Sequence, residues 1–228
     1  MIFLKALKKF IVPVIFTVIT VALAIIVLKV DVAPVGVNGT SIGLSTINVK
    51  MRDAIGTNLM WYKVTEIIGY IAILLCAMFG LVGLIQWIKR KNILKVDTEI
   101  LCLGVLYIIT IAFYVFFLKA DINLRPIVMP GETAPEASFP SSHTMLACVV
   151  FGSAIMIVGK YIKKGIWAEI AALLLGVLIG IMVTGRLLSG VHWLTDIIVG
   201  VVMGATLLTW FKAFLNLFNG TLVKGKHG

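Results

Sequence analysis

The chain has 228 residues, of which 61% are apolar and 13% are charged, and its mean hydropathy is +1.10. Soluble domains are about 45–50% apolar and about 25% charged, so this composition excludes an ordinary soluble domain and an intrinsically disordered chain. The net charge of +10 is not taken as a sign of nucleic-acid binding, because Lys and Arg accumulate in the cytoplasmic loops of membrane proteins.

Six apolar runs follow one another along the chain, and each is about long enough to cross a bilayer as a helix, for which about 20 apolar residues are needed. They cover residues 10–28, 67–88, 100–118, 144–158, 166–184 and 191–208. Helices are expected because backbone groups in lipid must pair within their own segment. The sequence therefore predicts an all-α polytopic membrane bundle of six transmembrane helices, with residues 1–228 forming a single domain.

Basic residues predict the orientation of this bundle. Of the 20 Lys and Arg residues, 13 lie before the first span, between the second and third, between the fourth and fifth, or after the sixth. The positive-inside rule therefore predicts that both termini are cytoplasmic and that residues 29–66, 119–143 and 185–190 face outward. Within the outer segment 31–63, apolar residues recur at helical spacing over 42–55, which predicts an interfacial helix on the outer membrane surface. An ordinary loop packed on the bundle is the alternative.

Ionisable and polar residues gather at the predicted outer ends of three spans, where such residues are costly in a membrane and functional by default. The third span is followed by Lys119 and Arg125, the fourth begins at Ser141, Ser142 and His143, and the sixth begins with Arg186, His192 and Asp196. Each group alone also has a structural interpretation, as a helix cap, a structural His–Asp pair, or arginines that snorkel to the interface. Their occurrence on one predicted side favours a common site.

The chemistry that this set suits is phosphoryl transfer. Arg125 and Arg186 supply planar donors that bind phosphate oxygens in pairs, and the N-terminus of the fourth span offers free N–H groups. Asp196 follows His192 by four residues, one helical turn, so it can hold one ring N–H and leave the other nitrogen bare as a nucleophile. His143 can protonate the leaving oxygen. No carboxylate pair and no His or Cys ligand set in the sequence indicates a metal site.

Three motifs in this region resemble those of the type-2 phosphatidic acid phosphatase superfamily, which includes membrane lipid phosphatases and soluble vanadium haloperoxidases. They are Lys119…Arg125-Pro126, Pro140-Ser141-Ser142-His143 and Gly185-Arg186-x5-His192-x3-Asp196, within residues 119–196. The family pattern is Lys-x6-Arg-Pro, Pro-Ser-Gly-His and Ser-Arg-x5-His-x3-Asp. The departures from it are that Lys119 is one residue too close to Arg125, Ser142 replaces a glycine, and Gly185 replaces a serine.

The resemblance implies a role for each of these residues. His192 would attack phosphorus and form a phosphohistidine, Asp196 would orient it, and His143 would protonate the leaving group and then activate water. The residues that would bind the phosphate are Arg125, Arg186, Ser141, Ser142 and Lys119. The resemblance implies no metal and no cofactor.

We therefore expect an integral membrane lipid phosphatase in the plasma membrane, with its active site on the extracytoplasmic side. Undecaprenyl diphosphate is the first substrate candidate, because the short loop between the first two motifs resembles bacterial members of the family. Phosphatidylglycerophosphate or phosphatidic acid is the second. A non-catalytic transporter or scaffold that keeps the anion site is the alternative from another functional class. The expected partners are the lipid phosphate and membrane lipids, nucleic acid is not expected, and the sequence indicates no oligomeric state.

Overall fold

The computed structural model describes residues 7–162 and 165–224, and within them the chain forms helices and connections with no β-strand. The α-helices are α2 (Ile11–Lys29), α3 (Ser45–Ile55), α4 (Leu59–Arg90), α5 (Thr98–Ala120), α6 (Ser142–Tyr161), α7 (Ile166–Ser189) and α8 (Leu194–Lys224). Two short 3-10 helices, η1 (Val37–Gly39) and η2 (Ile93–Lys95), lie in the connections. All of these helices except α3 and the 3-10 turns are long and apolar enough to cross a membrane. The predicted all-α bundle of six spans is confirmed.

The second span begins earlier than the sequence predicted. Asn58 caps α4 by accepting a hydrogen bond from the backbone N–H of Met60 (3.0 Å), so the helix starts at Leu59 and runs for 32 residues. At about 1.5 Å per residue, a helix of that length is about 48 Å long, more than a bilayer core requires. Glu66, which the sequence placed in an outward-facing segment, therefore lies two turns inside α4.

The boundary between the last two spans also differs from the prediction. Helix α7 continues to Ser189, so Arg186 lies in its last turn and not at the start of the sixth span. Helix α8 begins only at Leu194, which leaves His192 in the short connection before it. Asp196 lies in the first turn of α8. Two different helices and the turn between them thus supply the third motif.

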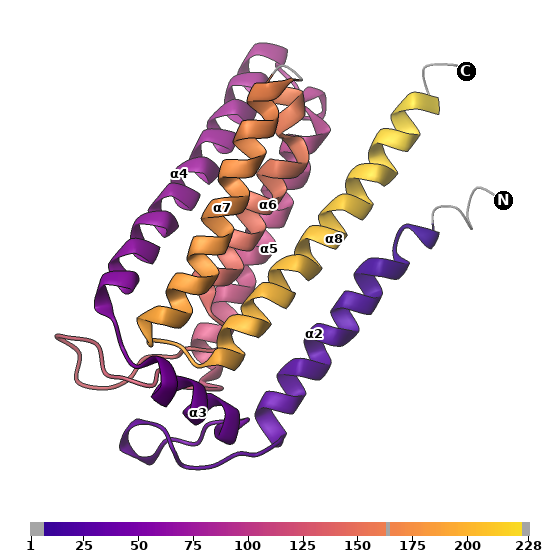
Figure 1. The fold of residues 1–228 in the computed structure, drawn as a ribbon. Helices are drawn as coiled ribbons and strands as arrows, with labels where there is room; N and C mark the ends of the chain where they lie inside the picture. The colour runs from indigo at the N-terminus through magenta and orange to yellow at the C-terminus, as the bar shows by residue number, and fades with distance from the viewer. Residues whose placement is uncertain (1–6, 163–164, 225–228) are drawn as a thin grey trace.

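The centre of the bundle is α6, which packs against α4, α5, α7 and α8, while α2 lies outside the bundle along α8 (Figure 1). Residues Val149, Val150 and Phe151 in the middle of α6 are completely buried. Close approach of α6 and α8 depends on Gly204, because a Cβ atom there would lie 2.5 Å from the Cβ of Cys148. At the starts of the two helices, the N–H of Ser141 donates to the backbone oxygen of Asp196 (2.9 Å), which holds the beginnings of α6 and α8 together.

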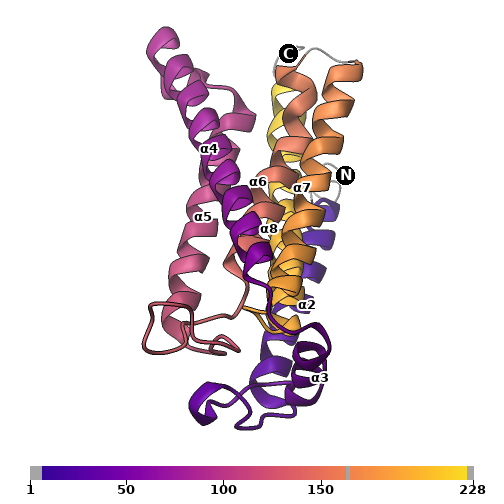
Figure 2. The ribbon, with the colours of Figure 1, turned by 60° about the vertical axis from the view of Figure 1, so that its left-hand side comes forward.

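The segment between the first two spans contains a helix that packs across one end of the bundle, where α4 and α8 begin and α7 ends (Figures 1 and 2). This helix, α3, begins at Ser45, three residues later than predicted. Its Asn48 is completely buried; the side-chain amide donates to Thr195 Oγ1 (2.9 Å) and accepts from the N–H of Thr195 (3.2 Å). The predicted helix exists, and its buried side is fixed to the start of α8.

Candidate active site

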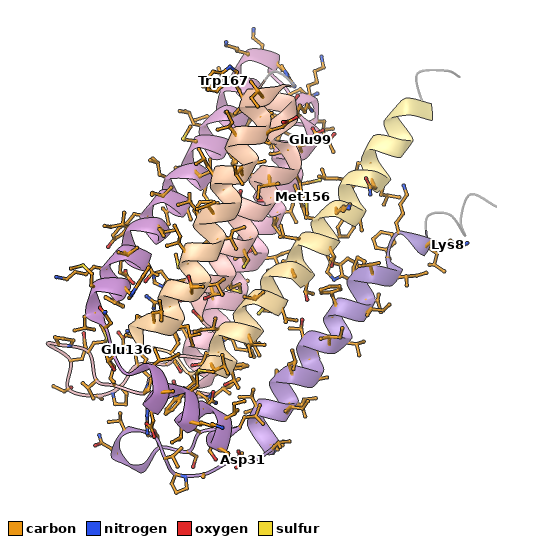
Figure 3. All side chains as sticks on the ribbon, in the orientation of Figure 1. Lys8, Asp31, Glu99, Glu136, Met156 and Trp167 are labelled. Carbon is orange, nitrogen blue, oxygen red and sulfur yellow. The ribbon has the colours of Figure 1, made fainter. Side chains whose placement is uncertain are left out.

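The predicted site residues from three helix ends meet at the end of the bundle that carries α3. The connection between α5 and α6 crosses this end, beside the last turn of α7 and the first turn of α8. Figure 3 shows Glu136, from that connection, at this end with Asp31, whereas Glu99 and Trp167 lie at the opposite end. Helix α2 begins and helix α8 ends on the side of the molecule away from α3 (Figure 1).

His192 is held by a contact on each ring nitrogen. Its Nδ1 lies 3.1 Å from the backbone oxygen of Ser138, and its Nε2 lies 2.9 Å from Nη2 of Arg186. A carbonyl only accepts and a guanidinium only donates, so Nδ1 carries the proton and Nε2 presents a lone pair. Burial, together with the positive charges of Arg186 and Arg125, holds the pKa of His192 well below its ordinary value. The ring is therefore neutral at physiological pH, as a nucleophile must be.

Asp196 does not make the direct hydrogen bond to His192 that the four-residue spacing predicted. The distance from its Oδ2 to His192 Nδ1 is 3.8 Å, which is too long. The carboxylate is completely buried and accepts three other hydrogen bonds, from Ser138 Oγ (2.7 Å), Asn123 Nδ2 (3.1 Å) and the N–H of Trp193 (3.0 Å). Asp196 thus fixes the Ser138 segment, whose carbonyl in turn orients His192.

Arg186 is completely buried at the end of α7, beside the first turns of α4. Its Nη1 donates to Thr65 Oγ1 and to Glu66 Oε1, both at 3.2 Å, and its guanidinium lies over the ring of Tyr62, 5.2 Å from the centroid. A buried guanidinium requires such a counter-charge. Because its Nη2 also contacts His192 Nε2, Arg186 links His192 to the side chains of α4.

His143, the second residue of α6, also has a carboxylate partner, which the sequence reasoning missed. Its Nε2 lies 3.1 Å from Glu66 Oε1, the same oxygen that accepts from Arg186. Glu66 is far from His143 along the chain, so spacing in the sequence does not suggest this pair. An ionisable residue beside an apolar run was the available signal for Glu66. Ser138 and Asn123 carried no comparable signal.

Arg125 enters the site from the connection before α6. Its side chain is 12% exposed, and Nη2 forms an ion pair with Glu136 Oε2 (2.8 Å) in the same connection. The backbone pairs there too, because the N–H of Arg125 donates to the oxygen of Glu136 (2.8 Å). The positive charge of Arg125 is one of the causes that lower the pKa of His192.

The remaining predicted phosphate ligands differ in placement. Ser141 is buried, with its hydroxyl 3.0 Å from Thr144 Oγ1 and its N–H on the oxygen of Asp196 (2.9 Å), so both groups already have protein partners. Ser142 lines a cavity beside His143. Lys119 is exposed on the outer face of α5, in a shallow hollow with Val115 and Phe116, and no described residue pairs with it. The structure does not bring Lys119 to the site.

Four buried N–H or ring nitrogen atoms at the site have no hydrogen-bond partner among the described residues. They are Nε and Nη1 of Arg125, Nε of Arg186 and Nδ1 of His143. Unpartnered buried donors are costly and rare in folded proteins, so a group of them marks a place where an anion binds. Within the described residues, no cluster of three or more His, Cys, Asp or Glu side chains is arranged to hold a metal.

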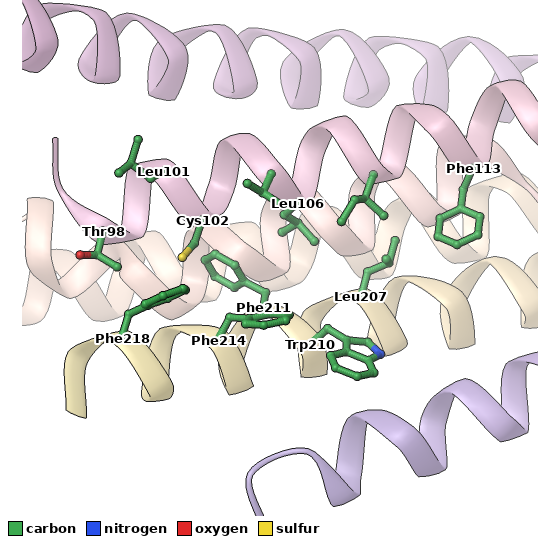
Figure 4. Close-up of a pocket in the computed structure, with 12 residues that line it drawn as sticks. Thr98, Leu101, Cys102, Leu106, Phe113, Leu207, Trp210, Phe211, Phe214 and Phe218 are labelled. Carbon is green, nitrogen blue, oxygen red and sulfur yellow. The ribbon is translucent and has the colours of Figure 1, made fainter. Parts of the chain in front are cut away.

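Two cavities differ in their relation to this site. One of about 420 Å³ lies between α4, α5 and α6 and has a mainly apolar lining, to which Tyr107, Thr110, Tyr114, Ser142 and His143 add polar groups. Another, of about 710 Å³, lies between α5 and α8 and is drawn in Figure 4. Its lining is apolar apart from Thr98 and Cys102, so it offers no set of groups for phosphoryl transfer. The first cavity is the one that belongs to the site.

The structure is similar to one described as the first transmembrane PAP2 type phosphatidylglycerolphosphate phosphatase from Bacillus subtilis, with a TM-score of 0.56 and 20% sequence identity. The match covers 89% of this chain and 94% of that chain, and at this identity it shows the fold. No match was found among curated proteins. A family model described as PAP2 superfamily matches residues 99–219, which include all three predicted motifs and more than half of the chain. The chain therefore belongs to the PAP2 superfamily, and it is a membrane phosphatase.

Proposed function

We propose that the protein hydrolyses a lipid phosphate or diphosphate at the extracytoplasmic face of the plasma membrane, through a phosphohistidine formed on His192. The observation that carries this proposal is the set of unpartnered buried donors on Arg125, Arg186 and His143 around a neutral His192. Cationic donors that surround a nucleophile offset the charge on the oxygens of a transferring phosphoryl group. The placement outside the cytoplasm rests on the distribution of basic residues along the sequence.

The proposed reaction has two steps. In the first, the lone pair of His192 Nε2 forms a bond to phosphorus while the bond to the leaving oxygen breaks, and doubly protonated His143 gives that oxygen a proton. In the second, neutral His143 takes a proton from water, whose oxygen bonds to phosphorus as the P–N bond breaks and its electrons return to Nε2. Phosphate is released and both histidines regain their starting states.

The apolar cavity beside His143 supports a lipid as the leaving group. It has a volume of about 420 Å³ and lies between spans, with side chains such as Ile73, Ile111 and Leu146 along its walls. A hydrocarbon tail in this cavity would gain from the removal of apolar surface from water and would place the ester oxygen next to His143.

The substrate itself has two main candidates. Undecaprenyl diphosphate is the candidate that the sequence placed first. The structural relative is described as a phosphatidylglycerolphosphate phosphatase, which is a specific reason to set that lipid beside it. Phosphatidic acid completes the series, because a monoester and a diphosphate need the same phosphate-binding groups.

A phosphate-release panel tests this proposal. The purified chain, in detergent with a chelator present, is offered undecaprenyl diphosphate, phosphatidylglycerophosphate and phosphatidic acid, and we expect release from at least one of them. A brief reaction with labelled substrate should leave acid-labile, base-stable phosphate on the protein, and His192→Ala should abolish both signals. Absence of release from every lipid would instead favour a transporter or scaffold, and activity lost to the chelator would contradict the metal-free mechanism.

A further inference from the structure

One carboxylate links the two histidines of the site. Glu66 Oε1 lies 3.1 Å from His143 Nε2 and accepts from Arg186 Nη1 at 3.2 Å. Arg186 Nη2 lies 2.9 Å from His192 Nε2. A continuous series of contacts therefore runs from His143 through Glu66 and Arg186 to His192. Glu66 belongs to α4, outside the three sequence motifs and outside the matched residues 99–219.

We propose that Glu66 is a positioning residue for the general acid, holding His143 so that its Nδ1–H faces the leaving oxygen; this rests on the proposed function. A doubly protonated imidazole has two donors. Glu66 takes the one on Nε2, and the other, on Nδ1, is buried without a partner among the described residues. Because His143 also lines the apolar cavity between α4, α5 and α6, the free donor is the atom available to a lipid ester oxygen.

The same helix makes room for the ring that Glu66 holds. Gly69 lies one turn after Glu66 on α4, and a Cβ atom there would come within 3.0 Å of His143 Cδ2 and 3.3 Å of Nε2. Cβ contacts this short require the neighbouring group to move. The carboxylate of Glu66 and the absence of a side chain at Gly69 therefore both determine the position of the His143 ring. Two independent features of α4 thus fix the same side chain.

A purely structural role for Glu66 predicts a different result and must be separated from this one. Arg186 is completely buried, and Glu66, which is 25% exposed at its side chain, is the carboxylate that pairs with it. If Glu66 served only to neutralise Arg186, its loss would disturb phosphate binding for every substrate equally. If Glu66 positions the acid, its loss should matter only where the leaving oxygen needs a proton.

The leaving group separates these two roles. Phosphatidic acid has an alkoxide leaving group that requires protonation, whereas p-nitrophenyl phosphate releases a stable phenolate without it. Since positioned acids contribute about 10²–10⁴-fold, Glu66→Gln should lower kcat for phosphatidic acid about 100-fold more than it lowers kcat for p-nitrophenyl phosphate. Glu132→Gln is the matched control, because Glu132 is exposed in the connection between α5 and α6 and no described residue forms a hydrogen bond or ion pair with its side chain. Gly69→Ala should reproduce the selective loss through displacement of the ring.

Each outcome decides between the roles. A loss in Glu66→Gln that is about 100-fold greater on phosphatidic acid than on p-nitrophenyl phosphate, with folding unchanged by size-exclusion chromatography, supports the proposal. Equal losses on both substrates, or full activity on both, overturn it. Full lipid activity in Gly69→Ala would also overturn it, because the ring would then tolerate displacement. A wild-type chain that is inactive on every substrate refutes the proposed function itself, and the positioning role with it.

Discussion

Replacement of Asp196 by Asn tests whether its charge or its hydrogen bonds serve the reaction. When His192 Nε2 bonds to phosphorus, the ring becomes positively charged, and the carboxylate 3.8 Å from Nδ1 stabilises that charge. Two unit charges about 4 Å apart interact by about 4 kcal/mol at an effective dielectric constant near 20. Because each 1.4 kcal/mol is about a tenfold change in rate, Asp196→Asn should slow phosphoenzyme formation by roughly 10²–10³-fold.

Ser138→Ala is the comparison variant. It removes the hydroxyl that donates to Asp196 at 2.7 Å but keeps the carbonyl that His192 contacts and the charge of the carboxylate. The lost bond should destabilise the fold by about 1–3 kcal/mol, because the buried carboxylate then keeps only two of its three donors. The rate of the chemical step should change by less than about tenfold, since the ring keeps both its orientation and its counter-charge.

A pre-steady-state burst of p-nitrophenol measures the nucleophilic step alone, because this leaving group needs no acid. The burst rate should be strongly reduced in Asp196→Asn and nearly unchanged in Ser138→Ala, with thermal unfolding recorded in parallel. A burst in Asp196→Asn within tenfold of the wild-type rate would refute the electrostatic argument. If Ser138→Ala slows the burst as much as Asp196→Asn, orientation through the loop and not charge governs the step.

Three further predictions follow from the same geometry. Arg125→Ala and Arg186→Ala should each lower kcat/KM for phosphate release by about 10²–10³-fold, because each removes a donor to the phosphoryl oxygens. Lys119→Ala should lower kcat/KM by less than about threefold. Equal losses in all three variants would show that Lys119 reaches the phosphate. A cysteine replacing Pro130, in a chain without the native cysteines, should react with an impermeant maleimide in intact cells, and labelling only after permeabilisation would place the site inside. Burial holds the pKa of His192 well below its ordinary 6.5. When the pH falls below about 6.5, His192 therefore binds a proton in the unfolded chain but not in the folded chain. The thermal stability of the wild type should therefore fall more steeply below that pH than that of His192→Asn, and parallel curves would contradict the assignment.

The spans were predictable because apolar length is a strong constraint in a bilayer, where backbone groups must pair within the helix. The errors lie where this constraint weakens. Residues 59–66 mix polar and apolar side chains, so composition did not show that α4 begins at Leu59, whereas the cap at Asn58 and the packing against α7 do. Similarly, Arg186 stays helical at the end of α7 because its charge is paired inside the bundle.

Spacing along the chain predicted contacts correctly only where the backbone is regular. The four-residue spacing of His192 and Asp196 implied a shared helix face, but α8 starts at Leu194, so His192 lies outside that helix. Asp196 instead reaches back to the N–H of Trp193, as an acidic residue in the first turn of a helix commonly does. Lys119 lies in a regular part of the backbone, because helix α5 continues to Ala120. Lys119 therefore shares the outer face of Val115 and Phe116, which lie four and three residues before it.

Glu66 shows why the acid–base pair of this site was the part least accessible to sequence reasoning. Motifs record residues that stay close along the chain, and His143 and Glu66 are brought together only when α4 packs against α6. In the sequence, His192 was predicted as the nucleophile because Asp196 lies four residues after it. In the structure, however, His143 is the histidine with a carboxylate within hydrogen-bond distance. Proximity to a carboxylate therefore does not identify the nucleophile. The assignment of His192 as nucleophile instead rests on its bare Nε2, fixed by the Ser138 carbonyl and faced by Arg186. A neutral ring with an oriented lone pair suits attack on phosphorus, and a ring held by a carboxylate suits the delivery of a proton.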